Sequence, residues 1–177
     1  IPSGTMATET LSGRIAVVTG ASAGIGEAIA RDLHGHGASV VINARRAEKL
    51  EQLARSLGSR VAAVAGDAAE DATIERVLAT AREKFGGGTR EADLIVINAG
   101  RGLGGTVITS DMSQWEEMIR TNVLAAAKLI RAAGQRLIKE QEGKSVDQML
   151  ERARDIIVIG STVGRHVSPF SSMYGGT

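Results

Sequence analysis

The chain reads Thr19-Gly20-Ala21-Ser22-Ala23-Gly24-Ile25-Gly26 between a short apolar run and a run with helical periodicity. Residues 14–18 before it are rich in β-branched side chains, which is typical of a buried strand. After it, apolar side chains recur at helical spacing as far as Leu33. A glycine-rich turn that opens a helix presents free backbone N–H groups and the positive end of the helix dipole to an anion. The stretch therefore predicts the pyrophosphate-binding turn of a dinucleotide site; an ordinary tight turn between strand and helix is the alternative.

Strand-like and helix-like segments alternate along the rest of the chain. The expected strands are residues 14–18, 39–43, 61–65, 94–97 and 156–159. Helical periodicity follows each of the first four, with glycines at Gly58 and at residues 86–88 as stop signals. Strands separated by helices imply right-handed βαβ crossovers. The pattern predicts an α/β fold, a Rossmann-like, doubly wound parallel sheet with helices on both faces.

Two helical details can also be predicted. Residues 113–116 (SQWE) have the form of a capping box at the start of the long helix that covers residues 119–137. Residues 139–154 form a polar, charged stretch that could be an extended helix, a surface excursion or part of a subunit contact. Of these, a solvated helix is the favoured interpretation.

Composition excludes several classes of protein. The chain has 43% hydrophobic but only 2% aromatic residues, so its core must consist mainly of aliphatic side chains, as under a parallel sheet. A net charge of +1 and so few aromatics argue against nucleic-acid binding. There is no cysteine, and His34 and His36 have no companion ligands, so no metal site is expected. Without a long apolar run or a signal pattern, a cytoplasmic protein with no membrane contact is expected.

Small, polar or charged residues follow each expected strand. In doubly wound sheets a ligand binds beyond the carboxyl ends of the strands, so we expect these residues to converge on one crevice. Asp67, with Ala68, can accept from an adenine amino group, although an ordinary helix N-cap would look similar. The expected cofactor-binding residues are Gly20, Ser22, Ala23, Gly24, Ile25, Gly26, Arg45, Arg46, Asp67, Ala68, Asn98, Ala99 and Gly100.

Two arginines, Arg45 and Arg46, follow the second expected strand, where a carboxylate would favour NAD. A planar guanidinium can bind a phosphate with two hydrogen bonds, so the pair favours the 2′-phosphate of NADP, and NAD is the less favoured cofactor. A solvated charge pair at a helix start is the alternative. Because the glycine turn carries Ala23 rather than a basic residue, the preference for NADP depends on these two arginines.

Taken in order, the motifs resemble those of the short-chain dehydrogenase/reductase family, classical type. That family carries T-G-x-x-x-G-I-G, then N-A-G, an Asn in the next helix, a Ser after the fifth strand, and Y-x-x-x-K. This chain has Thr19–Gly26, Asn98–Gly100, Asn122, Ser161 and Tyr174 in the same order. Ser161 and Tyr174 are thirteen positions apart, which is the family's customary spacing.

The resemblance implies three catalytic residues. Hydride transfer to a carbonyl carbon needs a matching proton transfer at oxygen, and a tyrosine hydroxyl can act as that acid or base when nearby positive charge favours the phenolate. By resemblance Tyr174 is the proton donor or acceptor. Ser161 would hydrogen-bond the substrate oxygen, and Asn122 would hold a water-linked proton path.

The chain departs from the family pattern at its end. The family's lysine falls four positions after Tyr174, just beyond Thr177. We therefore interpret residues 11–177 as an NAD(P)-binding Rossmann domain truncated at the tyrosine motif, without the C-terminal strands and helices, and expect little activity from it alone. Residues 1–10 are interpreted as a tag remnant ahead of Met6 and a disordered N-terminus.

The expected function is that of an NADP(H)-dependent oxidoreductase acting on a carbonyl/alcohol pair, as a ketone or ketoacyl-type reductase. A small-molecule substrate and a homodimer or homotetramer are expected by resemblance. A catalytically inactive NADP(H)-binding regulatory protein of the same fold is the alternative. The presence of both Ser161 and Tyr174 argues against it, because a sensor has no need for both residues at this spacing.

Overall fold

The computed structural model describes residues 10–166 and 170–177. The predicted tag remnant and disordered N-terminus therefore lie outside the described residues, apart from Thr10. None of the helices in the described ranges is long and apolar enough to cross a membrane.

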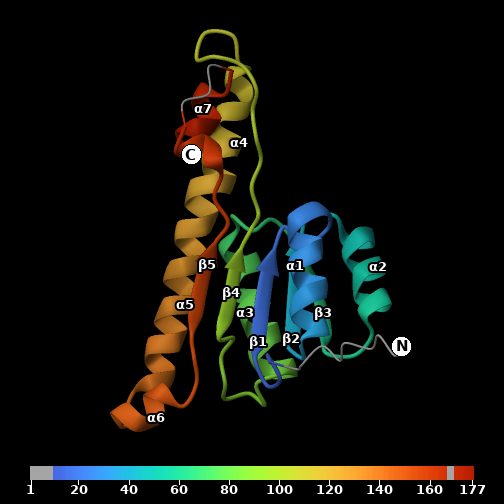
Figure 1. Cartoon of the computed structure of the whole chain (residues 1–177), viewed down its shortest axis with the longest axis vertical. Coiled ribbons are helices and arrows are strands. Elements are labelled where there is room, and N and C mark those ends of the chain that lie inside the picture. Colours follow the sequence, from blue (N-terminus) through green and yellow to red (C-terminus); the bar gives the residue numbers. More distant parts are fainter. Residues whose placement is uncertain (1–9, 167–169) are drawn as a thin grey trace, which may run out of the picture.

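A parallel sheet of five strands forms the centre of the described part of the chain, in the order β3-β2-β1-β4-β5 (Figure 1). The strands are β1 (Ile15–Thr19), β2 (Ser39–Ala44), β3 (Val61–Ala65), β4 (Leu94–Ile97) and β5 (Asp155–Val158). Val17 of β1 lies opposite Val41 of β2 on one side and Ile95 of β4 on the other. The strand order reverses between β1 and β4, and this switch point is where such sheets bind ligands. The predicted doubly wound fold is confirmed, with β3 and β4 at their predicted bounds.

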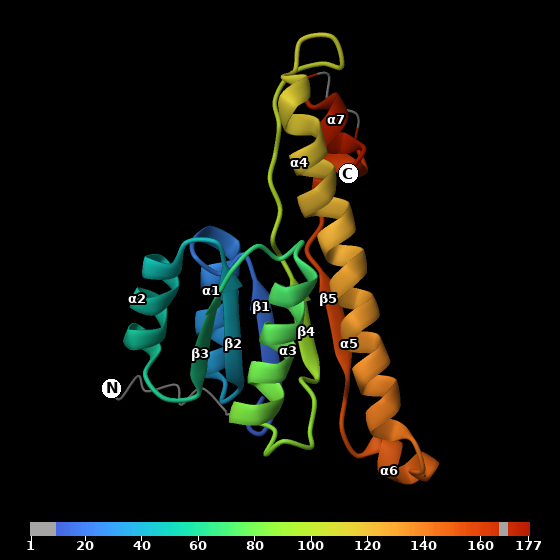
Figure 2. The same ribbon diagram turned by 180° about the vertical axis from the view of Figure 1, so that it is seen from behind.

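Helices cover both faces of the sheet (Figures 1 and 2). The longer helices are α1 (Gly24–Gly35), α2 (Ala47–Leu57), α3 (Asp71–Lys84) and α5 (Ala125–Gln141). Alternation along β1 separates two cores: Val17 packs with α3 and α5, whereas Val18 packs with α1 and α2. Both cores consist of Val, Ile, Leu and Ala almost throughout, with Met118 as a further fully buried side chain.

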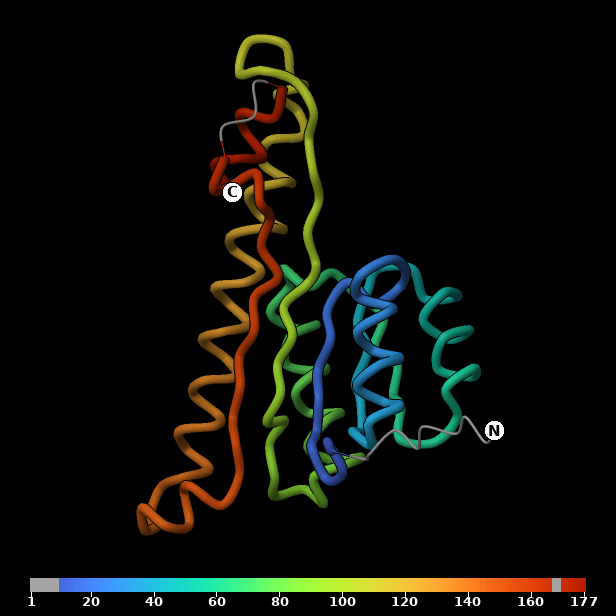
Figure 3. Tube along the Cα trace, in the orientation of Figure 1, coloured from blue at the N-terminus to red at the C-terminus, as the bar shows by residue number. Residues whose placement is uncertain are grey.

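A long helical rod extends beyond the carboxyl edge of the sheet. It consists of α4 (Trp115–Ile119), a π-helical turn η2 (Arg120–Leu124) and α5, with helical backbone angles across both junctions. The segment after β4 runs beside α4, and the short C-terminal helix α7 (Ser172–Gly175) lies beside the same end of the rod (Figure 3). A bridge between Gly105 and Ser171 joins these two segments. The C-terminal end of the described chain therefore lies beside the rod, near the carboxyl ends of β4 and β5.

The start of the rod corrects one prediction. The cap is Asp111, whose Oδ1 accepts from Ser113 N at 2.9 Å and opens the 3₁₀ turn η1 (Met112–Gln114). Ser113 instead donates its own hydroxyl to Asp111, so the predicted capping box at residues 113–116 is wrong. A capping box does form at Ser145 and Gln148, at the start of α6 (Val146–Leu150). Both are Ser-x-x-Glu/Gln patterns, and the residues before them decide which one is used.

Residues 139–154 do not form one solvated helix. They end α5, turn through α6 and return to β5, and several of their charged side chains pack against the amino edge of the sheet. Asp93, which is fully buried, accepts from Arg14 Nε at 2.9 Å and from Ile15 N at 3.0 Å. Arg152 Nε lies 3.2 Å from the other Asp93 oxygen, and Arg152 Nη2 donates to Glu140 at 2.6 Å. The segment is thus tied to the sheet by a partly buried ion network.

Candidate cofactor and catalytic site

The glycine turn between β1 and α1 is tighter than a side chain would allow. A Cβ at Gly26 would lie 2.4 Å from Asn98 Nδ2 and 2.5 Å from Gly20 O. At Gly20, which has a φ of +67°, a Cβ would lie 2.9 Å from Ala99 Cα. Gly24 has a φ of +61° and open space around it. The first and third glycines therefore allow close packing of β1, α1 and the β4 loop, and the second supplies the left-handed backbone conformation of the turn.

The amino end of α1 is suited to an anion. Its N-cap is Ala23, in an extended conformation, and an alanine has no side-chain oxygen to accept from the first N–H groups. These groups and the positive end of the dipole of a twelve-residue helix face the turn. A pyrophosphate is the kind of group that such an end binds.

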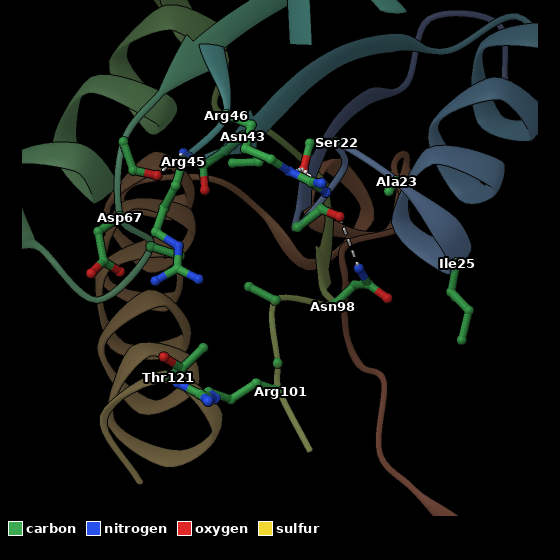
Figure 4. A pocket seen from close by; sticks show the side chains of 16 residues that line it. Ser22, Ala23, Ile25, Asn43, Arg45, Arg46, Asp67, Asn98, Arg101 and Thr121 are labelled. Carbon is green, nitrogen blue, oxygen red and sulfur yellow. Dashed lines mark hydrogen bonds between the residues drawn. The ribbon is translucent and has the colours of Figure 1, made fainter. Parts of the chain in front are cut away.

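A cavity of about 450 Å³ opens over this turn, at the carboxyl ends of β1 to β4 (Figure 4). Eleven of the thirteen predicted cofactor residues line it, whereas Gly24 and Gly26 shape the turn below. The lining residues among those predicted are Gly20, Ser22, Ala23, Ile25, Arg45, Arg46, Asp67, Ala68, Asn98, Ala99 and Gly100. The predicted convergence of strand ends on one crevice therefore holds for these four strands.

Sequence reasoning missed three other residues of this cavity, namely Asn43, Gly66 and Thr121. The first two adjoin predicted residues at the ends of β2 and β3, so the rule about strand ends could have found them. Thr121, in η2, gave no such signal, because only the tertiary fold brings the rod over this edge. Asn43 is buried, and its amide donates to Val64 O at 2.9 Å, which holds β2 and β3 together below the cavity.

Thr19 and Asn98 fix the β1 and β4 ends to each other. Thr19 Oγ1 accepts from the backbone N–H groups of Asn98 and Ala99, both at 3.0 Å. In return Asn98 Nδ2 donates to Thr19 O at 3.0 Å. These bonds cross the switch point, so the floor of the cavity is held rigidly where the cofactor is expected.

The two predicted phosphate-binding arginines have different partners. Arg46 donates from Nε and Nη2 to Ser22 Oγ, at 3.1 and 2.9 Å. Arg45 donates from Nη1 to Glu117 Oε1, at 2.9 Å, and its side chain is 66% exposed. Both guanidinium groups line the cavity, Arg46 beside the glycine turn and Arg45 toward α4 (Figure 4).

Asp67 is held by two hydrogen bonds at the same edge. Its Oδ1 accepts from Ala69 N at 2.9 Å and its Oδ2 from Arg120 Nη1 at 2.6 Å. Burial by itself raises the pKa of Asp67, but these hydrogen bonds and the Arg120 charge lower it overall. The N-cap of α3 is Glu70, so Asp67 forms a local turn and the alternative of a helix N-cap is wrong.

A second cavity, of about 500 Å³, adjoins the first. The two share Ile25 and the stretch Asn98–Arg101. The three predicted catalytic residues line this second cavity from three different elements: Asn122 in η2, Ser161 after β5, and Tyr174 in α7. The fold therefore collects residues that are far apart in the chain at one continuous crevice.

The side chain of Asn122 makes hydrogen bonds through both its amide oxygen and its amide nitrogen. Its Oδ1 accepts from Arg101 N at 2.9 Å, and its Nδ2 donates to Arg101 O and to Thr177 Oγ1, both at 2.9 Å. It sits in the π-helical turn, a distortion that is frequent at functional sites. Ser161 Oγ accepts from Val163 N at 3.3 Å, which leaves its own hydroxyl hydrogen to donate elsewhere.

Comparison with known proteins agrees with this arrangement. The family model described as short chain dehydrogenase matches residues 14–177. An uncharacterized oxidoreductase of Staphylococcus epidermidis is 30% identical over 93% of this chain and 65% of the relative. Another, from Staphylococcus aureus strain MW2, is 32% identical over 94% of this chain and 66% of the relative.

A solved structure is also similar. The crystal structure of a 3-ketoacyl-(acyl-carrier-protein) reductase from Brucella melitensis, complexed with NADH, matches with a TM-score of 0.81 and 26% identity. The match covers 94% of this chain and 65% of that one. The chain thus spans about two thirds of the length of the proteins it matches. With the fold, the glycine turn and the family model in agreement, the chain belongs to the short chain dehydrogenase family.

Proposed function

We propose that the protein is an NADP(H)-dependent oxidoreductase that interconverts a carbonyl compound and its alcohol, of the ketone or ketoacyl type. One observation carries the proposal. Ser161, Tyr174 and Asn122 line a single cavity, and that cavity shares Asn98–Arg101 with the cavity over the glycine turn. A dinucleotide in the first cavity can thus extend toward a substrate in the second.

The residues over the glycine turn fit a nicotinamide dinucleotide. The uncapped end of α1 would bind the pyrophosphate, Asp67 and Ala68 the adenine, and Arg45 with Arg46 the 2′-phosphate. When bound, the cofactor supplies or accepts the hydride. The Brucella protein is described with NADH, so the preference for NADP is a distinct part of the proposal.

The protein's own residues supply the proton and hold the substrate. In the reductive direction the hydroxyl of Tyr174 gives its proton to the substrate oxygen as the carbonyl carbon gains the hydride. Ser161 donates its hydroxyl hydrogen to the same oxygen, because its Oγ already accepts from Val163 N. Asn122 keeps the Arg101 backbone and Thr177 in place beside the cavity.

A homodimer or homotetramer is part of the same proposal. The outer face of α5 exposes apolar side chains, with Ile130 40% and Ile138 70% exposed. These two side chains are the contact residues that the proposal names, and the self-association itself is proposed from the family resemblance.

The proposal is tested by NADPH oxidation with the complete protein against ketones, quinones and acyl thioesters. Turnover of at least one carbonyl class is expected. Binding of NADPH without turnover of any class would instead favour the catalytically inactive regulatory protein.

A further inference from the structure

Glu117 of α4 bridges two arginines that line the cofactor cavity. Its Oε1 accepts from Arg45 Nη1 at 2.9 Å, and its Oε2 is paired with Arg101 Nη1. Arg101 is oriented in turn by Gln114, which accepts from its other terminal nitrogen. Arg45 follows β2 and Arg101 follows β4, so this one carboxylate joins two of the loops that line the cavity. Figure 4 shows the two arginines on these loops.

We propose that Glu117 is a specificity-determining residue of the dinucleotide site, which limits how strongly the site favours a 2′-phosphate over a 2′-hydroxyl. This inference rests on the proposed function. The carboxylate holds the Arg45 guanidinium before any phosphate arrives. A 2′-phosphate must therefore displace Glu117 from Arg45 or share the guanidinium with a second negative charge.

The competition concerns Arg45 and not Arg46. Arg46 donates to the neutral hydroxyl of Ser22, so a phosphate that binds Arg46 does not compete with a carboxylate for its guanidinium. Arg45 is held by an anion in a charge-assisted hydrogen bond, the stronger kind. A 2′-hydroxyl brings no charge, so the binding of NADH needs no change in the pair between Glu117 and Arg45.

The carboxylate is charged and oriented for this role. The hydrogen bond from Arg45 and the charge of Arg101 lower the pKa of Glu117. Its side chain is 40% exposed, so the carboxylate is within reach of solvent ions and of a ligand phosphate. Salt therefore weakens the effect, and it is best measured at low ionic strength.

The test is titration of NADPH and NADH, followed by nicotinamide fluorescence, with the complete protein at low salt. Glu117→Gln removes the charge, and Glu117→Ala also removes any remaining hydrogen bond to Arg45. Both are expected to tighten NADPH binding about three- to fivefold, the upper scale of an exposed ion pair, while NADH binding changes less than about 1.5-fold. Glu116→Gln is the matched control, because Glu116 lies next along the same helix, is exposed and has no ion pair among the described residues.

A second experiment tests whether the increase in NADPH affinity depends on Arg45. In an Arg45→Ala background, Glu117→Gln is expected to leave NADPH binding unchanged. If Glu117→Gln and Glu117→Ala fold and leave NADPH binding as in the unaltered protein, or match Glu116→Gln, the inference is overturned and the proposed function stands. If the unaltered protein binds neither dinucleotide, the proposed function fails, and the inference with it.

Discussion

Asn122 brackets the backbone of Arg101: its amide oxygen accepts from Arg101 N and its amide nitrogen donates to Arg101 O, both at 2.9 Å. The pair fastens the segment after β4 to the π-helical turn of the rod. Because Arg101 lines both cavities, one side chain of the rod sets the position of the segment that the two cavities share.

Replacing Asn122 with Ala should therefore loosen this segment. Two backbone groups of Arg101 lose their partners, and we expect the free energy of unfolding to fall by about 1–3 kcal/mol. Urea denaturation measures this free energy of unfolding. Thr177→Val is the control, since it removes the third hydrogen bond of Asn122 and the bond from Thr177 Oγ1 to Tyr174 O but leaves both bonds to Arg101. An Asn122→Ala protein as stable as the unaltered one would contradict this role.

Removing Arg45 and Arg46 together should weaken NADPH far more than NADH. Each guanidinium contributes charge-assisted hydrogen bonds to a 2′-phosphate, so we expect NADPH binding to fall about 10- to 100-fold. Fluorescence titration measures both cofactors. The control is Arg55→Ala, on the solvent side of α2, where the side chain lies 3.8 Å from Glu51. Equal losses for NADPH and NADH would rule out the assignment of the pair to the 2′-phosphate.

Tyr174→Phe should abolish turnover and leave cofactor binding largely intact. The change deletes only the hydroxyl oxygen, which the proposed proton transfer requires, and Tyr174 lines the second cavity but not the one over the glycine turn. Steady-state NADPH oxidation and NADPH titration together separate the two effects. Normal turnover would remove Tyr174 from the mechanism.

Asp93→Ala should strongly destabilise the fold without touching the cofactor site. The buried carboxylate pairs with Arg14 and Arg152, and its loss leaves both largely buried guanidinium groups short of a partner. We expect a loss of about 3–5 kcal/mol in urea denaturation. The contrast is Asp71→Ala, which breaks a surface pair with Lys128 and should cost less than about 1 kcal/mol. Similar losses for both variants would show that the Asp93 network contributes nothing beyond a surface pair.

Most of the fold could be predicted from local sequence patterns. The bounds of β3 and β4, the glycine stop after α2 and the glycine turn before α1 were all predictable, because strand alternation, helical spacing and glycine geometry depend on neighbouring residues. The cap at the start of the rod was not, since Asp111 accepts from both the backbone N–H and the hydroxyl of Ser113, so the Ser113 side chain does not cap the helix.

Thus the sequence by itself determined the α/β alternation, the doubly wound sheet and the glycine turn, which together place a dinucleotide site at the strand ends. Only the tertiary structure decided how the charged groups pair. Glu117 lies 72 positions from Arg45, and Arg120 lies 53 from Asp67. Charged side chains carry no periodicity that marks their partners, so these pairs follow from the path of the rod across the edge of the sheet.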